Sequence, residues 1–461
     1  MTSERYHFAG IGGIGMSALA RLLRARAIAV SGSDLKTSPM LEEFARDGVR
    51  VAIGQRAENL GDATILVVSS AIAHDNPEYV AARERGLPIV TRGELLAQLT
   101  RGMRTVAIAG THGKTTTTAM TAAIFEAAGY DPTVAVGGER LDTHSNARSG
   151  ASDWFITESD ESDGSFLHLS PYIAVVTNIE NDHIASDADI PQLIAQFTSF
   201  LSSLPAAGHA VIGTDNAASA RLAAATSAPV TTFATRAAAD MRARDLTYAA
   251  LGSHFTVDER GAQLGAIALA VPGEINVQNA LAALAVARAA GIDFGIAAAA
   301  LAAFRGVRRR FEIVGRSAAL TVVDDYAHHP TAVAQTIAAA RAAHDGPIVV
   351  AFQPHRYTRT AYLAADFARA LANADHVVLT PIYGASEKPI EGVSERSIGE
   401  PLARTGTPVE YVSAVEDLIE RIPALAPHNA LVLMLGAGSI SAVAQTLGLR
   451  VGAPDGALAR G

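Results

Sequence analysis

A glycine-rich segment with one lysine and several threonines carries the strongest sign of chemistry in the sequence. Its residues are Gly110-Thr111-His112-Gly113-Lys114-Thr115-Thr116. In this order, backbone N–H groups can surround phosphates, the lysine can reach the β- and γ-phosphates, and the next threonine hydroxyl can ligate Mg²⁺. Ile108 stands where a P-loop usually has its first glycine, so the segment is a shortened variant. We expect it to bind ATP or GTP.

Potential metal ligands follow two apolar segments of the same region. The acidic run Glu158–Asp163 comes directly after Trp154–Thr157, and His183 lies in the polar stretch after Ile173–Thr177. The carboxyl ends of strands in an open α/β sheet face the ligand crevice. Glu158 comes first after its strand, so we expect it to serve a metal, and we expect His183 to contact a ligand or a phosphate. A solvated acidic loop and an exposed histidine are the alternatives.

A second glycine-rich segment lies close to the N-terminus. Gly10, Gly12 and Gly15 match the Gly-x-Gly-x-x-Gly dinucleotide fingerprint, and Asp34 lies near the spacing of its ribose-binding acid. Glycines at these positions allow a tight turn and let backbone N–H groups approach a pyrophosphate at a helix N-terminus. The pattern predicts diphosphate binding without specifying NAD. A tight turn with no ligand is the alternative.

Two later segments combine histidine and arginine after apolar runs. The first is Asp324–Thr331 and the second is Gln353–Thr360. Guanidinium groups pair bidentately with carboxylate or phosphate, so the two segments together indicate anion recognition. Helix capping beside a surface arginine pair is the alternative.

The elements that must position these residues alternate between strand and helix. Glycine-rich segments follow the strands predicted at Tyr6–Phe8 and Thr105–Ala109, and each opens a helix. Such alternation predicts α/β domains with largely parallel, doubly wound sheets. We expect three domains, at residues 1–103, 104–310 and 311–461. The further strands that we predict are Ile28–Ser31, Thr64–Ser69, Leu320–Asp324, Ile348–Phe352, His376–Thr380 and Leu431–Leu435.

The composition excludes several classes of protein. The 461 residues are 49% hydrophobic, which is incompatible with a disordered chain. No cysteine is present, so disulfides, thiolate metal sites and cysteine nucleophiles are excluded. The net charge of -9 argues against a nucleic-acid partner. We expect a soluble cytosolic protein with no signal peptide, no membrane insertion and no obligate protein partner.

Five motifs in this order resemble those of the Mur ligases, the ATP-dependent ligases of peptidoglycan synthesis. They occupy residues 10–17, 110–117, 158–163, 325–331 and 353–359, and the match covers nearly the whole chain. The resemblance implies an N-terminal Rossmann-like domain that binds a UDP-sugar and a central P-loop ATPase domain. It also implies a Rossmann-like C-terminal domain that binds an amino acid and closes over ATP.

The resemblance also implies roles for single residues. Lys114 would hold the ATP phosphates, Thr115 and Glu158 would bind Mg²⁺ or Mn²⁺, and His183 would contact a second metal ion. His355 and Arg359 complete the expected catalytic set. The other expected ATP contacts are Gly110, Thr111, His112, Gly113, Thr116, Asn276, Asn279, Arg310, Asp325 and His328. The expected UDP-sugar contacts are Gly10, Gly12, Gly13, Gly15, Met16, Ser17, Asp34 and Ser70. The expected amino-acid contacts are Tyr326, His355, Arg356 and Arg359.

Two positions bear on the branch of the family. Several relatives carry a carbamylated lysine near the second metal, whereas Lys114 is the only lysine of the central region here. In lacking this second lysine, the chain resembles the alanine-adding branch. The family's Gly-x-His-Asn-x-x-Asn segment departs from its pattern, because Ile275 replaces the histidine while Asn276 and Asn279 are kept. Segment 383–389 also resembles a family segment, and its role stays open.

The resemblance implies ATP-dependent amide formation. The lactyl carboxylate of UDP-N-acetylmuramate would attack ATP to give an acyl phosphate, and L-alanine would then displace phosphate. Three alternatives stay open. A recycling ligase would add a tripeptide to the same sugar nucleotide, a nicotinamide oxidoreductase would use the first glycine-rich segment, and a sensor would bind both nucleotides without turnover.

Overall fold

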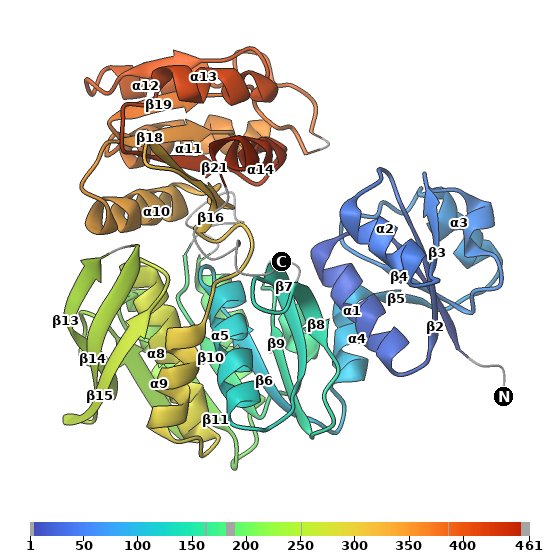
Figure 1. The fold of residues 1–461 in the computed structure, drawn as a ribbon. Helices are drawn as coiled ribbons and strands as arrows, with labels where there is room; N and C mark the ends of the chain where they lie inside the picture. The colour runs from blue at the N-terminus through green and yellow to red at the C-terminus, as the bar shows by residue number, and fades with distance from the viewer. Residues whose placement is uncertain (1–3, 162–163, 181–189, 250, 386, 453–461) are drawn as a thin grey trace. The chain divides into compact units, whose positions relative to one another are not determined.

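The computed structural model describes residues 4–161, 164–180, 190–249, 251–385 and 387–452. Three α/β regions follow one another along the chain (Figure 1). By its internal contacts the chain divides into two compact units. The first comprises residues 1–242, 258–264 and 278–301, and the second comprises residues 243–257, 265–277 and 302–461. Within the described ranges, no helix is long and apolar enough to cross a membrane.

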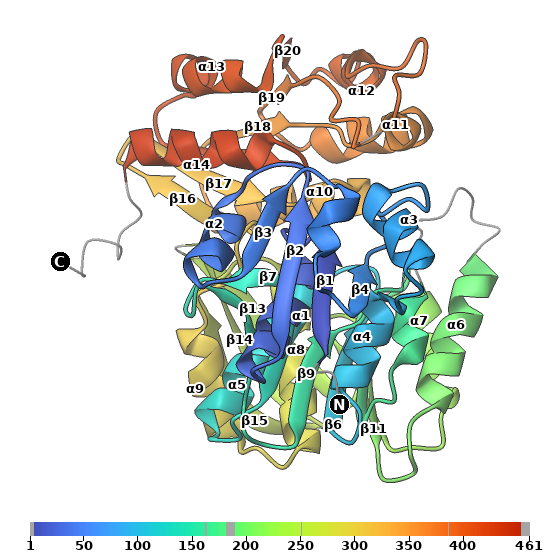
Figure 2. The same cartoon turned by 90° about the vertical axis from the view of Figure 1, so that its right-hand side faces the viewer.

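The N-terminal region is a five-stranded parallel sheet with order β3-β2-β1-β4-β5. Figure 2 shows β3, β2, β1 and β4 in this order. The strands are β1 Arg5–Ala9, β2 Ala29–Asp34, β3 Arg50–Ile53, β4 Ile65–Val68 and β5 Ile89–Thr91. The helices are α1 Ile14–Ala25, α2 Pro39–Arg46, α3 Pro77–Glu84 and α4 Arg92–Leu99. Because α1 follows β1 directly, the first glycine-rich segment lies at the carboxyl edge of this sheet.

The central region is built on a sheet with order β15-β14-β13-β12-β11-β10-β6-β9-β7-β8. The strands are β6 Arg104–Ala109, β7 Thr133–Arg140, β8 Ser145–Arg148, β9 Trp154–Glu158, β10 Ile173–Val176, β11 His209–Gly213, β12 Val230–Ala234, β13 Met241–Ala249, β14 Gly252–Glu259 and β15 Ala262–Leu269. The helices are α5 Lys114–Ala127, α6 Ile190–Ser202, α7 Ala217–Ala220, α8 Glu274–Ala289 and α9 Phe294–Ala303. Since β6 pairs in parallel with both β9 and β10, the residues after these three strands meet at one edge.

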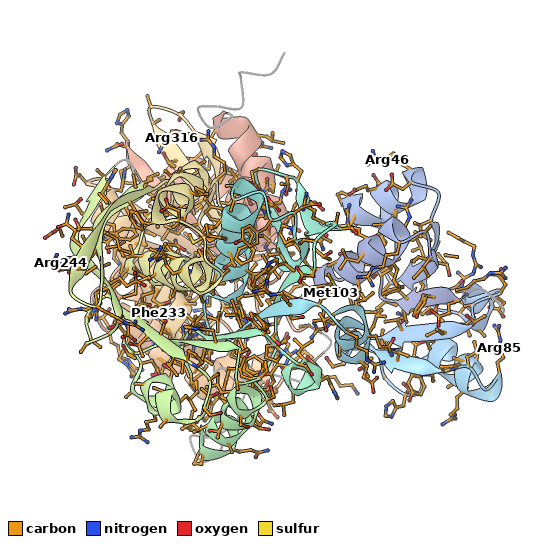
Figure 3. All side chains as sticks on the ribbon, turned by 90° about the horizontal axis from the view of Figure 1, so that it is seen from below. Arg46, Arg85, Met103, Phe233, Arg244 and Arg316 are labelled. Atoms are coloured by element: carbon orange, nitrogen blue, oxygen red, sulfur yellow. The ribbon has the colours of Figure 1, made fainter. Side chains whose placement is uncertain are left out.

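The apolar core of the first unit runs through both of its α/β regions. One cluster of buried side chains includes Phe8 and Leu96 from the first region and Phe155 and Phe197 from the second. Met103, labelled in Figure 3, precedes β6 and packs against this cluster. The two regions therefore share a core.

The C-terminal region carries a six-stranded sheet with order β16-β17-β21-β18-β19-β20. The strands are β16 Glu312–Arg316, β17 Leu320–Asp325, β18 Ile348–Phe352, β19 His376–Leu379, β20 Val409–Tyr411 and β21 Ala430–Leu435. The helices are α10 Pro330–Ala343, α11 Tyr357–Leu371, α12 Arg396–Ala403, α13 Leu418–Leu425 and α14 Ile440–Val451. Only β16 runs antiparallel, among the pairings described for this sheet.

The predicted strands are present, with ends that differ by up to three residues, the largest difference being at the end of β2. Three of these differences concern candidate site residues. Glu158 is the last residue of β9 rather than the first residue after it, because its backbone still pairs with Ile108 of β6. Asp34 and Asp325 are likewise the last residues of β2 and β17 rather than residues that follow these strands.

Candidate active site

The second glycine-rich segment forms a tight turn between β6 and α5. Gly110 and Gly113 have φ values of +124° and +87°, which side chains rarely adopt. A Cβ atom on Gly110 would lie 2.1 Å from Thr177 Oγ1, and one on Gly113 would lie 2.2 Å from Asn279 Oδ1. Both glycines are therefore required by conformation and by space. The turn leaves Lys114 as the first residue of α5.

Lys114 forms a buried ion pair with Glu161. Its Nζ donates to Glu161 Oε2 at 2.9 Å, to Oε1 at 3.1 Å and to the Gly110 carbonyl at 2.7 Å. Burial raises the pKa of Glu161, against the opposing charge of Lys114. Burial also lowers the pKa of Lys114, but the charges of Glu161, Asp160 and Glu158 outweigh it and the net shift is upward. Lys114 therefore stays protonated at the end of the turn.

Thr115 and Glu158 place two oxygen atoms side by side next to this lysine. Thr115 Oγ1 donates to Glu158 Oε2 at 2.8 Å. A Cβ atom on Gly137 would lie 1.6 Å from Glu158 Oε1, so the glycine makes room for the carboxylate. Hydroxyl and carboxylate oxygens are the ligands that Mg²⁺ prefers. A hydroxyl and a carboxylate oxygen side by side therefore fit this ion.

The metal donor set is small in the described part of the chain. No group of three or more His, Cys, Asp or Glu side chains is placed there to hold a metal ion. His183, the predicted contact of a second metal, lies outside the described residues.

The segment after β10 fixes the phosphate turn from the neighbouring strand. Asn178 Oδ1 accepts a hydrogen bond from His112 N at 2.8 Å, and Thr177 Oγ1 donates to His112 O at 2.7 Å. Thr111 Oγ1 accepts from Glu180 N at 2.8 Å. From the other side, Asn279 Oδ1 accepts from Thr117 Oγ1 at 3.2 Å. These side chains hold the turn in shape.

The first glycine-rich segment also forms a turn supported by hydrogen bonds. Gly10 N and Ile11 N donate to the Ser33 carbonyl at 2.8 and 3.0 Å. Gly12 N donates to Asp34 Oδ2 at 3.0 Å, and a Cβ atom on Gly12 would lie 2.8 Å from that oxygen. The predicted ribose-binding acid thus lies directly beside the predicted diphosphate turn. Of the other predicted contacts, Met16 is buried and Ser70 is exposed after β4.

A buried asparagine joins this turn to the central region within the first unit. Asn146 of β8 donates from Nδ2 to the Ile14 carbonyl at 2.7 Å and to Ser17 Oγ at 2.9 Å. Both acceptors belong to the first turn of α1. The N-terminus of the helix that would face the diphosphate is therefore held from the central sheet.

In the second unit, a histidine lies between aromatic rings and arginines. The His355 ring stacks on Tyr383 with centroids 5.8 Å apart and meets the His328 ring edge-on at 5.7 Å. Burial, together with the charges of Arg359 and Arg356, lowers the pKa of His355 to about 4. The imidazole is therefore neutral near pH 7. In the described part of the chain, its buried Nδ1 has no hydrogen-bond partner.

Arg310 and Asp325 lie beside Tyr326, whose ring contacts that of His328. The Arg310 guanidinium lies over the Tyr326 ring, 5.0 Å from its centroid, and His328 Nδ1 lies 2.8 Å from the Tyr326 carbonyl. Asp325 accepts from Phe311 N and Ala327 N, both at 2.7 Å. Burial raises the pKa of Asp325 to about 6. Its role toward the ATP ribose stays a prediction.

Models of three Mur ligase domains match the chain in order. The Mur ligase family catalytic domain matches residues 5–104, the Mur ligase middle domain matches residues 108–287, and the Mur ligase glutamate ligase domain matches residues 309–438. Two curated UDP-N-acetylmuramate–L-alanine ligases, from Acidithiobacillus ferrooxidans and Geotalea uraniireducens, are 45% and 42% identical to the chain. Each alignment covers 96% of this chain, and it covers 96% and 97% of the respective relatives. The chain belongs to the Mur ligase family.

Solved structures of Mur ligases share the fold. UDP-N-acetylmuramate-alanine ligase from Thermotoga maritima superposes with a TM-score of 0.85 and 29% identity, covering 97% of this chain and 98% of that one. A murein peptide ligase from Psychrobacter arcticus gives a TM-score of 0.73 and 25% identity, covering 97% and 99%. The predicted family and the predicted α/β fold of three domains are confirmed.

Several residues that support the sites of this Mur ligase were not predicted. They are Glu161, Asn178, Asn146, Tyr383 and Glu387. Glu161 and Asn178 follow strands that neighbour β6, so the strand-end rule that selected Glu158 could also have selected them. Asn146 and Glu387 act across long sequence separations and carry no local motif.

Proposed function

We propose that the chain joins L-alanine to the lactyl carboxylate of UDP-N-acetylmuramate, giving UDP-N-acetylmuramoyl-L-alanine, ADP and phosphate. The observation that carries this proposal is the phosphate turn, where Lys114 adjoins the oxygen pair of Thr115 and Glu158. Curated relatives with that activity, aligned along almost the whole chain, support the choice of substrates. Since ATP and UDP-sugars are intracellular, we also propose a cytoplasmic location.

The N-terminal turn would hold the UDP diphosphate. The turn that contains Gly10, Gly12, Gly13 and Gly15 leads directly into α1, and the N-terminus of this helix favours an anion. A diphosphate oxygen would accept the hydrogen bond from Gly12 N in place of Asp34. The Asp34 carboxylate would then be free to accept from the ribose hydroxyls. Ser17, held by Asn146, would fix the direction of this helix.

The central turn would hold ATP. Lys114 would exchange Glu161 for the β- and γ-phosphates, and Thr115 and Glu158 would hold Mg²⁺, or Mn²⁺ in its place. The metal, when bound, neutralises charge on the phosphate oxygens. Asn279 would act by shaping Gly113, since its Oδ1 fills the space beside that residue.

In this reaction the protein positions the substrates and does not supply a nucleophile of its own. A lactyl carboxylate oxygen attacks the γ-phosphorus, the bond to the ADP oxygen breaks, and an acyl phosphate forms. The alanine amine then attacks the acyl carbon, and phosphate leaves with the electron pair of the broken C–O bond. The nitrogen gives up one proton, which leaves with the phosphate or passes to water. Lys114 stabilises charge on the transferred phosphoryl group. Arg356 and Arg359 would pair with the alanine carboxylate.

A substrate-omission experiment tests the proposal. ADP release should require ATP, UDP-N-acetylmuramate and L-alanine together, and the product mass should equal that of the sugar nucleotide plus alanine minus water. The murein peptide ligase among the structural neighbours makes a tripeptide the necessary comparison. Release of ADP with the tripeptide and not with alanine would replace our proposal by the recycling reaction.

A further inference from the structure

The chain around Tyr383 contacts the segment that carries His355. Tyr383 N donates to the Pro354 carbonyl and Arg356 N donates to the Tyr383 carbonyl, both at 2.8 Å. The two segments thus pair as a short parallel bridge centred on His355 and Tyr383. The Tyr383 ring then stacks on the imidazole with an interplanar angle of 12°. The segment therefore fixes both the backbone and the ring plane of His355.

Glu387 of the same segment holds the beginning of α11. Its Oε2 accepts from Thr358 N at 3.1 Å, and its Oε1 accepts from Thr358 Oγ1 at 2.7 Å. Although burial raises the pKa of Glu387, hydrogen bonds from Thr358 and Tyr357 outweigh it and the net shift is downward. A carboxylate at a helix N-terminus also interacts favourably with the helix dipole. Arg359 is the next residue of this first turn.

The loop between these two contacts has a strained backbone. Arg356 has φ +69°, the left-handed region that residues other than glycine rarely adopt. The Tyr383 carbonyl accepts from Arg356 N, and the Arg356 carbonyl accepts from Thr360 N at 3.1 Å. A Cβ atom on Gly384 would lie 3.0 Å from the Glu387 carbonyl and 3.2 Å from Tyr357 Cε2. Surrounding contacts, rather than local preference, thus determine where His355, Arg356 and Arg359 point.

We propose that Tyr383 and Glu387 are positioning residues of the amino-acid site, which hold His355 and Arg359 in the orientation that receives the incoming amino acid. This inference rests on the proposed function. It assigns a role to the part of the chain that resembles a family segment and whose role the sequence left open. Neither residue needs to touch a substrate, because each acts through the loop that it holds.

The test compares the KM values of the three substrates in Glu387→Ala and in the matched control Glu391→Gln. Glu391 is exposed in the same connection between β19 and α12. We expect Glu387→Ala to raise the KM of alanine about tenfold, the effect of losing a charge-assisted hydrogen bond. The KM values of ATP and UDP-N-acetylmuramate should stay within about twofold, and the control should match the parent enzyme.

Tyr383 provides a second, independent variant pair. Tyr383→Phe keeps the stacked ring and should keep the KM of alanine, whereas Tyr383→Ala should raise it. Thr358→Val should raise it in the same direction as Glu387→Ala, and the double variant should add less than the sum of both. If circular dichroism shows that Glu387→Ala does not fold, the Tyr383 and Thr358 variants still test the positioning role.

The outcomes separate this inference from the proposed function. If the parent enzyme shows no alanine-dependent ADP release, the proposed function fails. If the parent enzyme turns over and folded Tyr383→Ala and Glu387→Ala keep the KM of alanine, the positioning role is refuted. An equal rise in all three KM values would also refute it, because it would indicate a general effect on the fold.

Discussion

Lys114 Nζ lies 2.9 Å from Glu161 Oε2, so the lysine expected to bind ATP already carries a counter-ion inside the phosphate turn. Both groups are largely removed from solvent, with side-chain exposures of 16% and 3%. In the proposed reaction, phosphate oxygens would take the place of Glu161 as partners of Lys114. The ion pair therefore holds the lysine in the turn before the nucleotide arrives.

Glu161→Gln should lower the Tm of the ligand-free enzyme, because a buried ammonium loses its compensating charge. The loss should be on the order of 1–3 kcal/mol, given that Lys114 keeps some contact with water. ATP with Mg²⁺ should recover most of the loss, because the phosphates restore the negative charge. Thermal unfolding with and without ATP checks this, with exposed Glu84→Gln as control. An equal ATP-induced shift in parent and variant would contradict the exchange of partners.

Glu158→Ala should abolish turnover, because one of the two protein oxygens predicted to hold the metal is removed. Glu158→Asp should keep part of the activity and regain more as Mg²⁺ is raised, since a shorter carboxylate binds the ion less tightly. EDTA should stop ADP release by the parent enzyme, and added Mg²⁺ should restore it. A Mg²⁺ dependence that is the same in parent and Glu158→Asp would disprove the assignment of Glu158.

Gly113→Ala should be far more damaging than Gly102→Ala. Both glycines have positive φ, +87° and +75°, so both substitutions carry a backbone cost of about 1 kcal/mol. Only at Gly113 does the new Cβ collide with Asn279 Oδ1, at 2.2 Å, while the space around Gly102 is open. Tm and the KM of ATP measure the difference. Equal behaviour of the two variants would show that Asn279 does not shape the turn.

Arg359→Lys should raise the KM of alanine about tenfold or more, because an ammonium cannot reproduce two parallel hydrogen bonds to a carboxylate. Arg369→Lys is the control, since Arg369 lies exposed on the same helix. Steady-state kinetics with each substrate varied in turn would reveal the effect. An unchanged alanine KM in both Arg359→Lys and Arg356→Lys would contradict the pairing of these arginines with the alanine carboxylate.

His355 should destabilise the enzyme as pH falls. Its pKa is about 4 in the folded chain, below the ordinary 6.5, so the unfolded state binds the proton first as acid is added. Its stabilising contribution is present above pH 6.5 and is lost between pH 6.5 and about 4. Asp325, with a pKa of about 6, acts in the opposite sense over part of this range.

The difference between the parent and His355→Gln isolates the histidine. The variant should gain stability relative to the parent as pH falls from 7 to about 4.5, in urea unfolding followed by circular dichroism. A pH-independent difference would mean that the imidazole is not held neutral by its surroundings.

Residues in linear motifs could be predicted from the sequence, and residues that act by tertiary pairing could not. The phosphate turn and Glu158 adjoin apolar strands, so local patterns place them at one sheet edge. The pairing of Lys114 with Glu161 required the path of the loop after β9. The contact of Glu387 with Thr358 joins residues 29 apart in sequence, one in a loop and the other in the first turn of α11.

The same distinction applies to the fold. Strands such as β10, and β6 from Val106 onward, are continuous apolar runs and were predicted. Mixed polar and apolar residues make up the short edge strand β20 and the antiparallel pair β7 and β8. Their own composition does not indicate a strand, because pairing with neighbouring strands determines their conformation. The order of β13 to β15 was not predicted for the same reason.

The most direct test of the central claim uses UDP-N-acetylmuramate labelled with ¹⁸O in the lactyl carboxylate. If this oxygen attacks ATP and alanine then displaces phosphate, each turnover should transfer one ¹⁸O atom to the released phosphate, as measured by mass spectrometry. Phosphate without ¹⁸O, formed together with the alanine-linked product, would contradict the acyl-phosphate route.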